Sequence, residues 1–310
     1  MNRANSDFMV IITIVVLLAL YCVTGWMAAS PVPGRPFISG LLATLAVAFS
    51  ALILYFANDR AMNEMSFPIP VIFVLLAAAN PCTLYAAPIH AAAALLAASI
   101  FFLLGFSSVS PSPGLLSLTF ISISAAGLFH PPLFWLIPVY AILTIVLFEN
   151  KFKGWVTIII SVLLPPLVLA GIRYLGSGSN PAEELLSGIW ARMTAIYLPK
   201  SNIHAATVLR IILTGVAAVF AIGHILRHLT TYKTSQFKAA VRIVILTLAI
   251  TLVALLFMPK GGKTAGILAA MPLSLLFNEY FRQPRHSPEV KTMAIVLILI
   301  LITERISYFV

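Results

Sequence analysis

Residues Trp155–Tyr174 read WVTIIISVLLPPLVLAGIRY, an apolar run of 20 residues whose single charge, Arg173, lies next to its end. At about 1.5 Å per residue, a helix of this length matches the hydrocarbon core of a bilayer, which is about 30 Å thick. Similar apolar runs recur from one end of the chain to the other. The sequence therefore predicts membrane-spanning helices.

Composition places the whole chain in the same class. It is 61% hydrophobic and 9% charged, whereas soluble domains carry about 25% charged residues. The apolar runs leave no room for a soluble domain, so we expect residues 1–310 to form a single integral-membrane domain. The net charge is +10, and basic residues flank the apolar runs. That pattern indicates contact with anionic lipid head groups and not with nucleic acid.

The expected fold is all-α, a polytopic transmembrane helical bundle with ten or eleven membrane segments, some of them short or re-entrant. The first run is longer than the core of a signal peptide, about 7–15 residues, so we expect it to remain as a helix. Leu115–Phe129 is short for a span and is expected to be tilted or shielded by its neighbours. The predicted segments are Phe8–Trp26, Phe37–Phe56, Pro68–Tyr85, Pro88–Phe106, Leu115–Phe129, Pro131–Phe148, Trp155–Tyr174, Ala205–Ile225, Ala239–Met258, Ala265–Phe277 and Thr292–Val310.

Basic residues also predict the orientation, because Lys and Arg concentrate on the cytoplasmic side of a membrane. If the loop between His228 and Ala239 is cytoplasmic, eleven of the 19 Lys and Arg residues fall inside. The N-terminus is then inside and the polar insert 176–203 is external.

The insert 176–203 contains a predicted amphipathic helix. Asn180-Pro181-Ala182-Glu183 has the form of a helix start, with a capping Asn, a Pro at the first helical position and a Glu that can reach back. We expect this helix to lie in the membrane interface. It is either a lid on the bundle or a lateral gate beside a lipid site. Its apolar face comprises Leu186, Ile189, Trp190, Met193 and Tyr197.

Five basic side chains surround this helix and form the predicted substrate-binding group. Guanidinium groups bind phosphate with two hydrogen bonds, so the group suits polyprenyl phosphate or another anionic lipid. Arg210 is expected about 9 Å inside its segment, where an Arg needs a partner or must extend to the surface. Ordinary contact with phospholipid head groups is the alternative. The five are Arg173, Arg192, Lys200, His204 and Arg210.

Three further motifs are weaker indications of function. Asn80-Pro81 breaks an apolar run, as either a simple kink or the broken helix of a transporter site. His224 and His228 have the spacing of metal ligands but no third ligand, so no metal is predicted. Gly262-Lys263 lacks the earlier glycine of a phosphate-binding loop, so no nucleotide or other cofactor is predicted. No catalytic residue can be assigned.

Carboxylates are nearly absent from the apolar runs. Eight of the nine lie outside them, and the ninth, Glu304, stands beside Arg305. Intramembrane acids are the usual carriers of protons and metal ions. Their scarcity therefore argues against an ion-coupled carrier, with Glu304 as the one candidate for such chemistry.

Three stretches carry a resemblance to a known family: LFHPPLFW at Leu128–Trp135, FENKFKGW at Phe148–Trp155 and LLPP at Leu163–Pro166. They are similar to an uncharacterised family of polytopic inner-membrane proteins of Bacteroidota, over roughly residues 70–175. The resemblance implies an inner-membrane location and no established activity. It supplies no catalytic residue.

We therefore expect a multi-pass protein of the bacterial inner membrane. It would be an accessory component, with membrane lipids and membrane proteins as partners, or a handler of anionic lipid-linked substrates, without ion-coupled transport. A transporter or flippase is one alternative. A polyprenyl-phosphate-dependent glycosyltransferase is another, because the short segments separated by prolines resemble those of such enzymes. These enzymes typically carry an acidic residue in the first external loop, whereas that loop in this chain, Met27–Pro36, contains Arg35 and no acid. Whether the protein is an enzyme stays open.

Overall fold

The computed structural model describes residues 37–62, 68–78, 87–108, 112–145, 151–177, 181–194, 205–228, 234–256 and 266–281, with four single positions beyond them. Within these ranges the chain is helical and contains no strand, which confirms the all-α bundle. The predicted segment Phe8–Trp26, the Asn80-Pro81 break and Glu304 lie outside the described residues.

Helix bounds in the described part follow the predicted segments closely. Three helices are long and apolar enough to cross a membrane, over Pro88–Gly105, Lys151–Gly176 and Phe237–Ala254. The elements are α2 (Phe37–Met62), α3 (Pro68–Ala78), α4 (Ala87–Ser108), α5 (Pro113–Phe129), η2 (Pro131–Trp135), α6 (Leu136–Ile145), α7 (Lys151–Ser177), α8 (Pro181–Thr194), α9 (Ala205–His228), α10 (Thr234–Leu256) and α11 (Gly266–Phe281).

The predicted span Pro131–Phe148 is wrong as a single helix. The structure divides it into the 3-10 turn η2 and the ten-residue helix α6. Two consecutive prolines, Pro131 and Pro132, lack N–H groups and disfavour helix at the preceding residue. His130 accordingly leaves the helical conformation, and its N–H donates to the Ala126 carbonyl at 2.9 Å. The described part of α6, Leu136–Ile145, is about 15 Å long.

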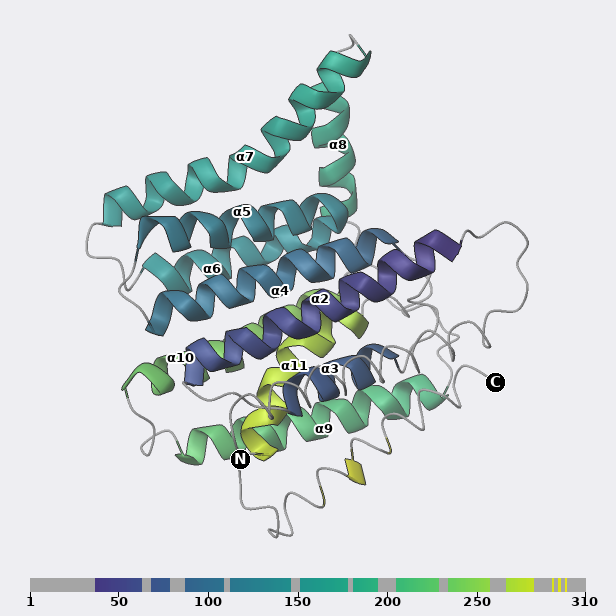
Figure 1. Cartoon of the computed structure of the whole chain (residues 1–310), viewed down its shortest axis with the longest axis vertical. Coiled ribbons are helices and arrows are strands. Elements are labelled where there is room, and N and C mark those ends of the chain that lie inside the picture. Colours follow the sequence, from purple (N-terminus) through teal and green to yellow (C-terminus); the bar gives the residue numbers. More distant parts are fainter. Residues whose placement is uncertain are drawn as a thin grey trace.

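Helices α2, α4, α5 and α7 lie side by side, each packed on the next (Figure 1). Beside this layer, α11 packs against α3, α9 and α10. The predicted shielding of the short segment Leu115–Phe129 is observed, because α5 packs between α4 and α7. Hydroxyl groups of Ser99 and Tyr140, 3.1 Å apart, link α4 to α6 inside the bundle.

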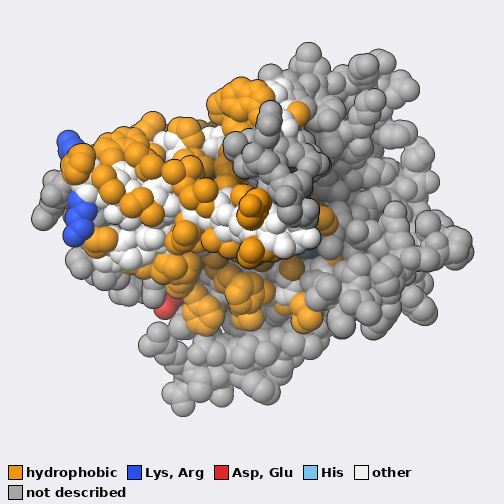
Figure 2. Space-filling model, turned by 90° about the horizontal axis from the view of Figure 1, so that it is seen from above, with side chains coloured by type: hydrophobic (Ala, Val, Ile, Leu, Met, Phe, Trp, Pro, Cys, Tyr) orange, Lys and Arg blue, Asp and Glu red, His pale blue; other side chains and the backbone are white. Residues whose placement is uncertain are grey.

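Small side chains allow the helices to approach closely. The buried stripe of α2 includes Ala43, Val47 and Ala51, spaced four residues apart, and α4 buries Ala93 and Ala97. Small residues have this role in membrane bundles, where lipid is as apolar as the core. The outer surface is also apolar, as Figure 2 shows for one face.

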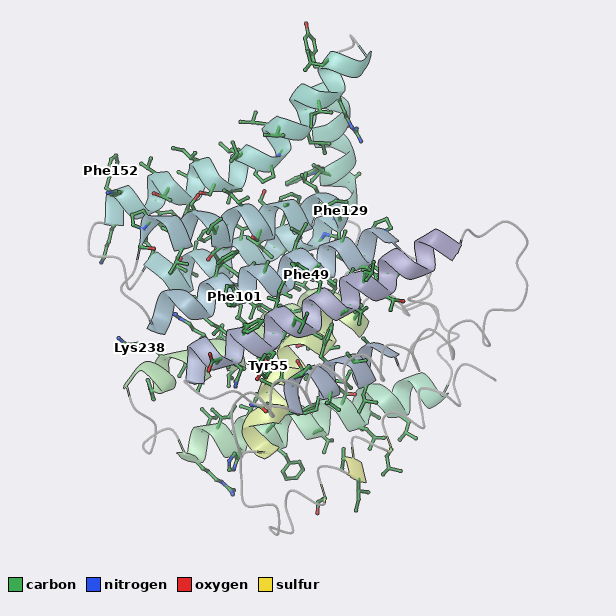
Figure 3. All side chains as sticks on the ribbon, viewed as in Figure 1. Phe49, Tyr55, Phe101, Phe129, Phe152 and Lys238 are labelled. Atoms are coloured by element: carbon green, nitrogen blue, oxygen red, sulfur yellow. The ribbon has the colours of Figure 1, made fainter. Side chains whose placement is uncertain are left out.

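The two ends of the bundle differ in the charged side chains that the structure describes there. Phe152 at the start of α7 and Lys238 at the start of α10 lie at one end, and Phe129 lies at the other (Figure 3). Basic side chains gather at the first end of the apolar surface (Figure 2). We call it the lysine end and the opposite one, where α7 meets α8, the α8 end. The exposed cations of the lysine end are Lys151, Lys153, Arg227 and Lys238.

Candidate functional site

Helix α7 is attached to the bundle through its first half. Its buried positions are Gly154, Ile158 and Ser161, which are four and three residues apart and therefore share one helical face. The Ser161 hydroxyl donates to the Ser117 hydroxyl of α5 at 2.9 Å. This polar contact fixes the height at which α7 crosses α5.

Two prolines, Pro165 and Pro166, interrupt the hydrogen bonds within α7. Pro166 has no N–H, so the Val162 carbonyl loses its donor one turn further along the helix. The Ser124 hydroxyl of α5 replaces that donor, at 2.7 Å from the Val162 oxygen. In an apolar setting a freed carbonyl needs such a partner. The neighbouring helix therefore satisfies the backbone at the proline pair.

Beyond the prolines α7 is surrounded by few protein atoms. Only 11% of its apolar span is buried, and Leu175 is 86% exposed. Exposed Trp155 and Tyr174 lie near the two ends of this span. They are separated by about 28 Å along the helix, close to the ~30 Å hydrocarbon core, and both residue types favour membrane interfaces. The second half of α7 has the properties of a lipid-facing helix.

Helix α8 returns from the end of α7 to the bundle, and begins at Pro181 as the sequence predicted. It packs against η2 and α7. The Trp135 indole N–H donates to the Met193 carbonyl at 3.1 Å. Ile189 and Met193 are half-buried, whereas Trp190 is 64% exposed. α8 is therefore held on the bundle by part of its apolar face, and another part faces outward.

The predicted substrate-binding residues are distributed over two sides of the bundle. Arg173 is exposed near the end of α7, and Arg192 belongs to α8, the helix that contacts it. Arg210 belongs to α9, which packs on α11 and lies across the bundle from α8 (Figure 1). Lys200 and His204 lie outside the described residues. The structure brings together the helices of Arg173 and Arg192 and places that of Arg210 apart.

His130 occupies the turn between α5 and η2, the element on which α8 packs. Burial lowers the pKa of the His130 imidazole to about 4. Desolvation has this effect because it penalises the charged form. The imidazole is consequently neutral at pH 7.

The sequence interpretation missed the burial of Arg242, which it counted among the cations flanking a loop. Its side chain is 4% exposed. The guanidinium donates to the carbonyl oxygens of Leu103 in α4 and Leu143 in α6, both at 3.3 Å. The signal was available, because Arg242 lies inside the predicted segment Ala239–Met258.

The α8 end combines the exposed guanidinium of Arg173 with exposed aromatic side chains from four elements. Aromatic residues suit the head-group region of a bilayer, and guanidinium groups suit phosphate. The aromatic residues are Phe129 of α5, Trp135 of η2, Tyr174 of α7 and Trp190 of α8. Comparison of the chain with protein-family models, curated proteins and solved structures finds no match.

Proposed function

We propose that the chain is a multi-pass protein of the bacterial inner membrane whose α8 end binds the phosphate of an anionic, lipid-linked substrate. Helix α7 is the observation that supports this most. It is long and apolar enough to span, and it is almost unburied. Exposed Trp155 and Tyr174 lie near the two ends of its span. A side chain at the position of Arg173 would then lie at head-group depth.

Charge supports the orientation. The described cations of the lysine end outnumber Arg173, the one described at the α8 end. Because Lys and Arg favour the cytoplasmic side, the lysine end would face the cytoplasm. The α8 end would then face the periplasm, where lipid-linked precursors are consumed or recycled. The resemblance to a family of inner-membrane proteins agrees with this location.

Arg173 is the proposed first contact of the phosphate, with Arg192 on the adjoining helix as the second. A guanidinium and a phosphate oxygen form charge-assisted hydrogen bonds, which are stronger than neutral ones. Lys200 and His204, which follow α8 in the chain, are proposed as further basic groups, and Arg210 of α9, across the bundle, as a more distant one. Their contribution is to attract the anionic head group by charge.

An accessory or substrate-handling role is proposed in preference to an ion-coupled one. The reason is the distribution of carboxylates, eight of which lie outside the long apolar runs. A carrier driven by protons or sodium usually needs an acid within the membrane.

Binding of a polyprenyl phosphate to the full-length protein in lipid nanodiscs tests this proposal. We expect the wild-type protein to bind the phosphate and not the uncharged polyprenol. Arg173→Gln should weaken binding about tenfold or more, because it removes charged hydrogen bonds. Arg173→Lys should weaken it less, since the charge stays.

Two further measurements distinguish a selective phosphate site from ordinary binding of anionic lipid. Lys238→Gln, at the lysine end, should leave binding unchanged. Excess phosphatidylglycerol should not displace a polyprenyl phosphate from a selective site, whereas it would displace one held as an ordinary anionic lipid. Equal binding of polyprenol and polyprenyl phosphate would contradict the proposal.

A further inference from the structure

We propose that the lysine end carries a separate lipid-binding surface, which binds the head groups of anionic phospholipids in the leaflet opposite to the α8 end. We call this surface the basic rim. It pairs exposed cations with exposed apolar side chains at the ends of three helices. The residues are Lys151, Phe152, Lys153 and Trp155 of α7, Leu226 and Arg227 of α9, and Phe237 and Lys238 of α10.

The start of α7 is the strongest part of the rim. Phe152 is 80% exposed and lies between two exposed lysines. Trp155 follows one turn later and is 46% exposed. In water these aromatic side chains would be an unfavourable surface. At a bilayer surface their rings can enter the interface while the ammonium groups extend to the phosphates.

The same pairing recurs on two other helices. Exposed Phe237 precedes Lys238 at the start of α10, and exposed Leu226 precedes Arg227 near the end of α9. The end of α9 and the start of α10 are separated by the five residues 229–233. Figure 3 places Phe152 and Lys238 at the same end of the bundle. Three separate helix ends thus present a cation beside an apolar side chain at one level.

Charge complementarity determines the proposed ligand. Among the side chains that the structure describes, the rim presents four exposed cations, and the one carboxylate is Asp59, which is half-buried. Lysines near a membrane surface each favour anionic lipid about fivefold. Exposed apolar side chains continue from the rim along α7, as Ile159 and Ile160 show. That continuity fits a phospholipid, whose anionic head group adjoins its acyl chains.

This inference rests on the membrane placement in the proposed function, but it concerns the opposite end of the molecule and a different ligand. The phosphate site at Arg173 can fail while the basic rim holds. Both proposals require the protein to be inserted in a membrane. Flotation of the full-length protein with liposomes tests this requirement. A protein that does not float with them overturns both proposals.

Tryptophan quenching by brominated lipids tests the rim itself. The full-length protein is placed in phosphatidylcholine liposomes that contain equal fractions of either brominated phosphatidylglycerol or brominated phosphatidylcholine. The difference in quenching between the wild-type protein and Trp155→Phe isolates the signal of Trp155. We expect that signal to be quenched several-fold more by the phosphatidylglycerol probe, and the preference to fall at high salt.

Matched variants identify the residues responsible. Lys151→Gln with Lys153→Gln should abolish the preference, whereas Lys151→Arg with Lys153→Arg should keep it. Arg173→Gln, at the α8 end, should have no effect on it. Equal quenching by the two probes in the wild-type protein would overturn the inference. So would a preference that survives the Gln pair, since the two lysines would then not bind the head group.

Discussion

His130 is a residue whose partial burial makes the stability of the protein depend on pH. Its pKa is about 4 in the folded protein, below the ordinary value of 6.5. Between these values the unfolded chain binds more protons than the folded one. The free energy of unfolding should therefore fall as the pH is lowered from 7 to 4, by at most about 1.4 kcal/mol per pH unit.

Thermal unfolding of the detergent-solubilised protein between pH 7.5 and pH 4.5 measures this effect. His130→Gln should remove much of the loss of stability in that range, because glutamine does not titrate. His224→Gln, a half-buried histidine of α9, provides the control. An unchanged pH dependence in His130→Gln would show that other groups determine it.

Arg242 shows which part of a residue's environment the sequence could predict. Its position inside an apolar segment indicated a need for partners. The partners themselves are backbone carbonyls 139 and 99 residues away along the chain. Every residue has a carbonyl, so no side-chain pattern marks these two. Only the folded arrangement of α4, α6 and α10 identifies them.

At the scale of the helix, α7 depends on α5 for its complete hydrogen bonding. Ser124→Ala would leave the Val162 carbonyl without the donor that replaces the missing proline N–H. We expect a loss of about 0.5–1.5 kcal/mol in the free energy of unfolding, the range of interhelical hydrogen bonds in membranes. Ser122→Ala, two residues earlier on α5, is the control and should lower the free energy of unfolding by less.

A double-mutant cycle with Pro166→Ala tests whether the Ser124 hydrogen bond compensates for the missing proline N–H. Alanine restores an N–H at position 166, so the Val162 carbonyl regains a donor within α7. Ser124→Ala should then cost less than it does beside Pro166. Unfolding in detergent, followed by circular dichroism, gives the four stabilities. Equal costs in both backgrounds would mean that the Ser124 bond does not compensate for the proline.

The apolar runs predicted the locations of α7 and α9, and each helix extends three or four residues beyond the predicted run into its charged or polar flank. Pro131–Phe148 failed because hydropathy measures polarity and not backbone conformation. Its residues are apolar throughout, yet two prolines at its start impose a 3-10 turn. The start of α8 was predictable because Asn is favoured as the N-cap of a helix and Pro at the first helical position, as in Asn180-Pro181.

At the scale of the whole molecule, the charge difference between the two ends predicts one orientation. Phe152 and Leu175 are both highly exposed and lie near opposite ends of α7. In a background without Cys22 and Cys82, Leu175→Cys should react with an impermeant maleimide in intact spheroplasts. Phe152→Cys should react only after permeabilisation. Labelling of both from outside, or the reverse pattern, would contradict the orientation.

The arrangement of helices was less predictable than the all-α class of the fold. The sequence grouped Arg173 and Arg210 because a single loop separates their helices. In the structure α9 packs on α11 and lies across the bundle from α8. When nearly every face of a helix is apolar, hydrophobicity does not select its neighbours, and side-chain shape decides them.

The hydrogen bond from Ser124 to Val162 holds α7 on α5 next to the proline pair, so the outer half of α7 would pivot about this point. Leu175 lies about 13 Å beyond Pro166 along the helix. A change of 10° in the bend would thus displace it by about 2 Å, and α8 with it. The outer half of α7 is a lever arm, through which a small rearrangement at the bilayer midplane would reach the head-group region.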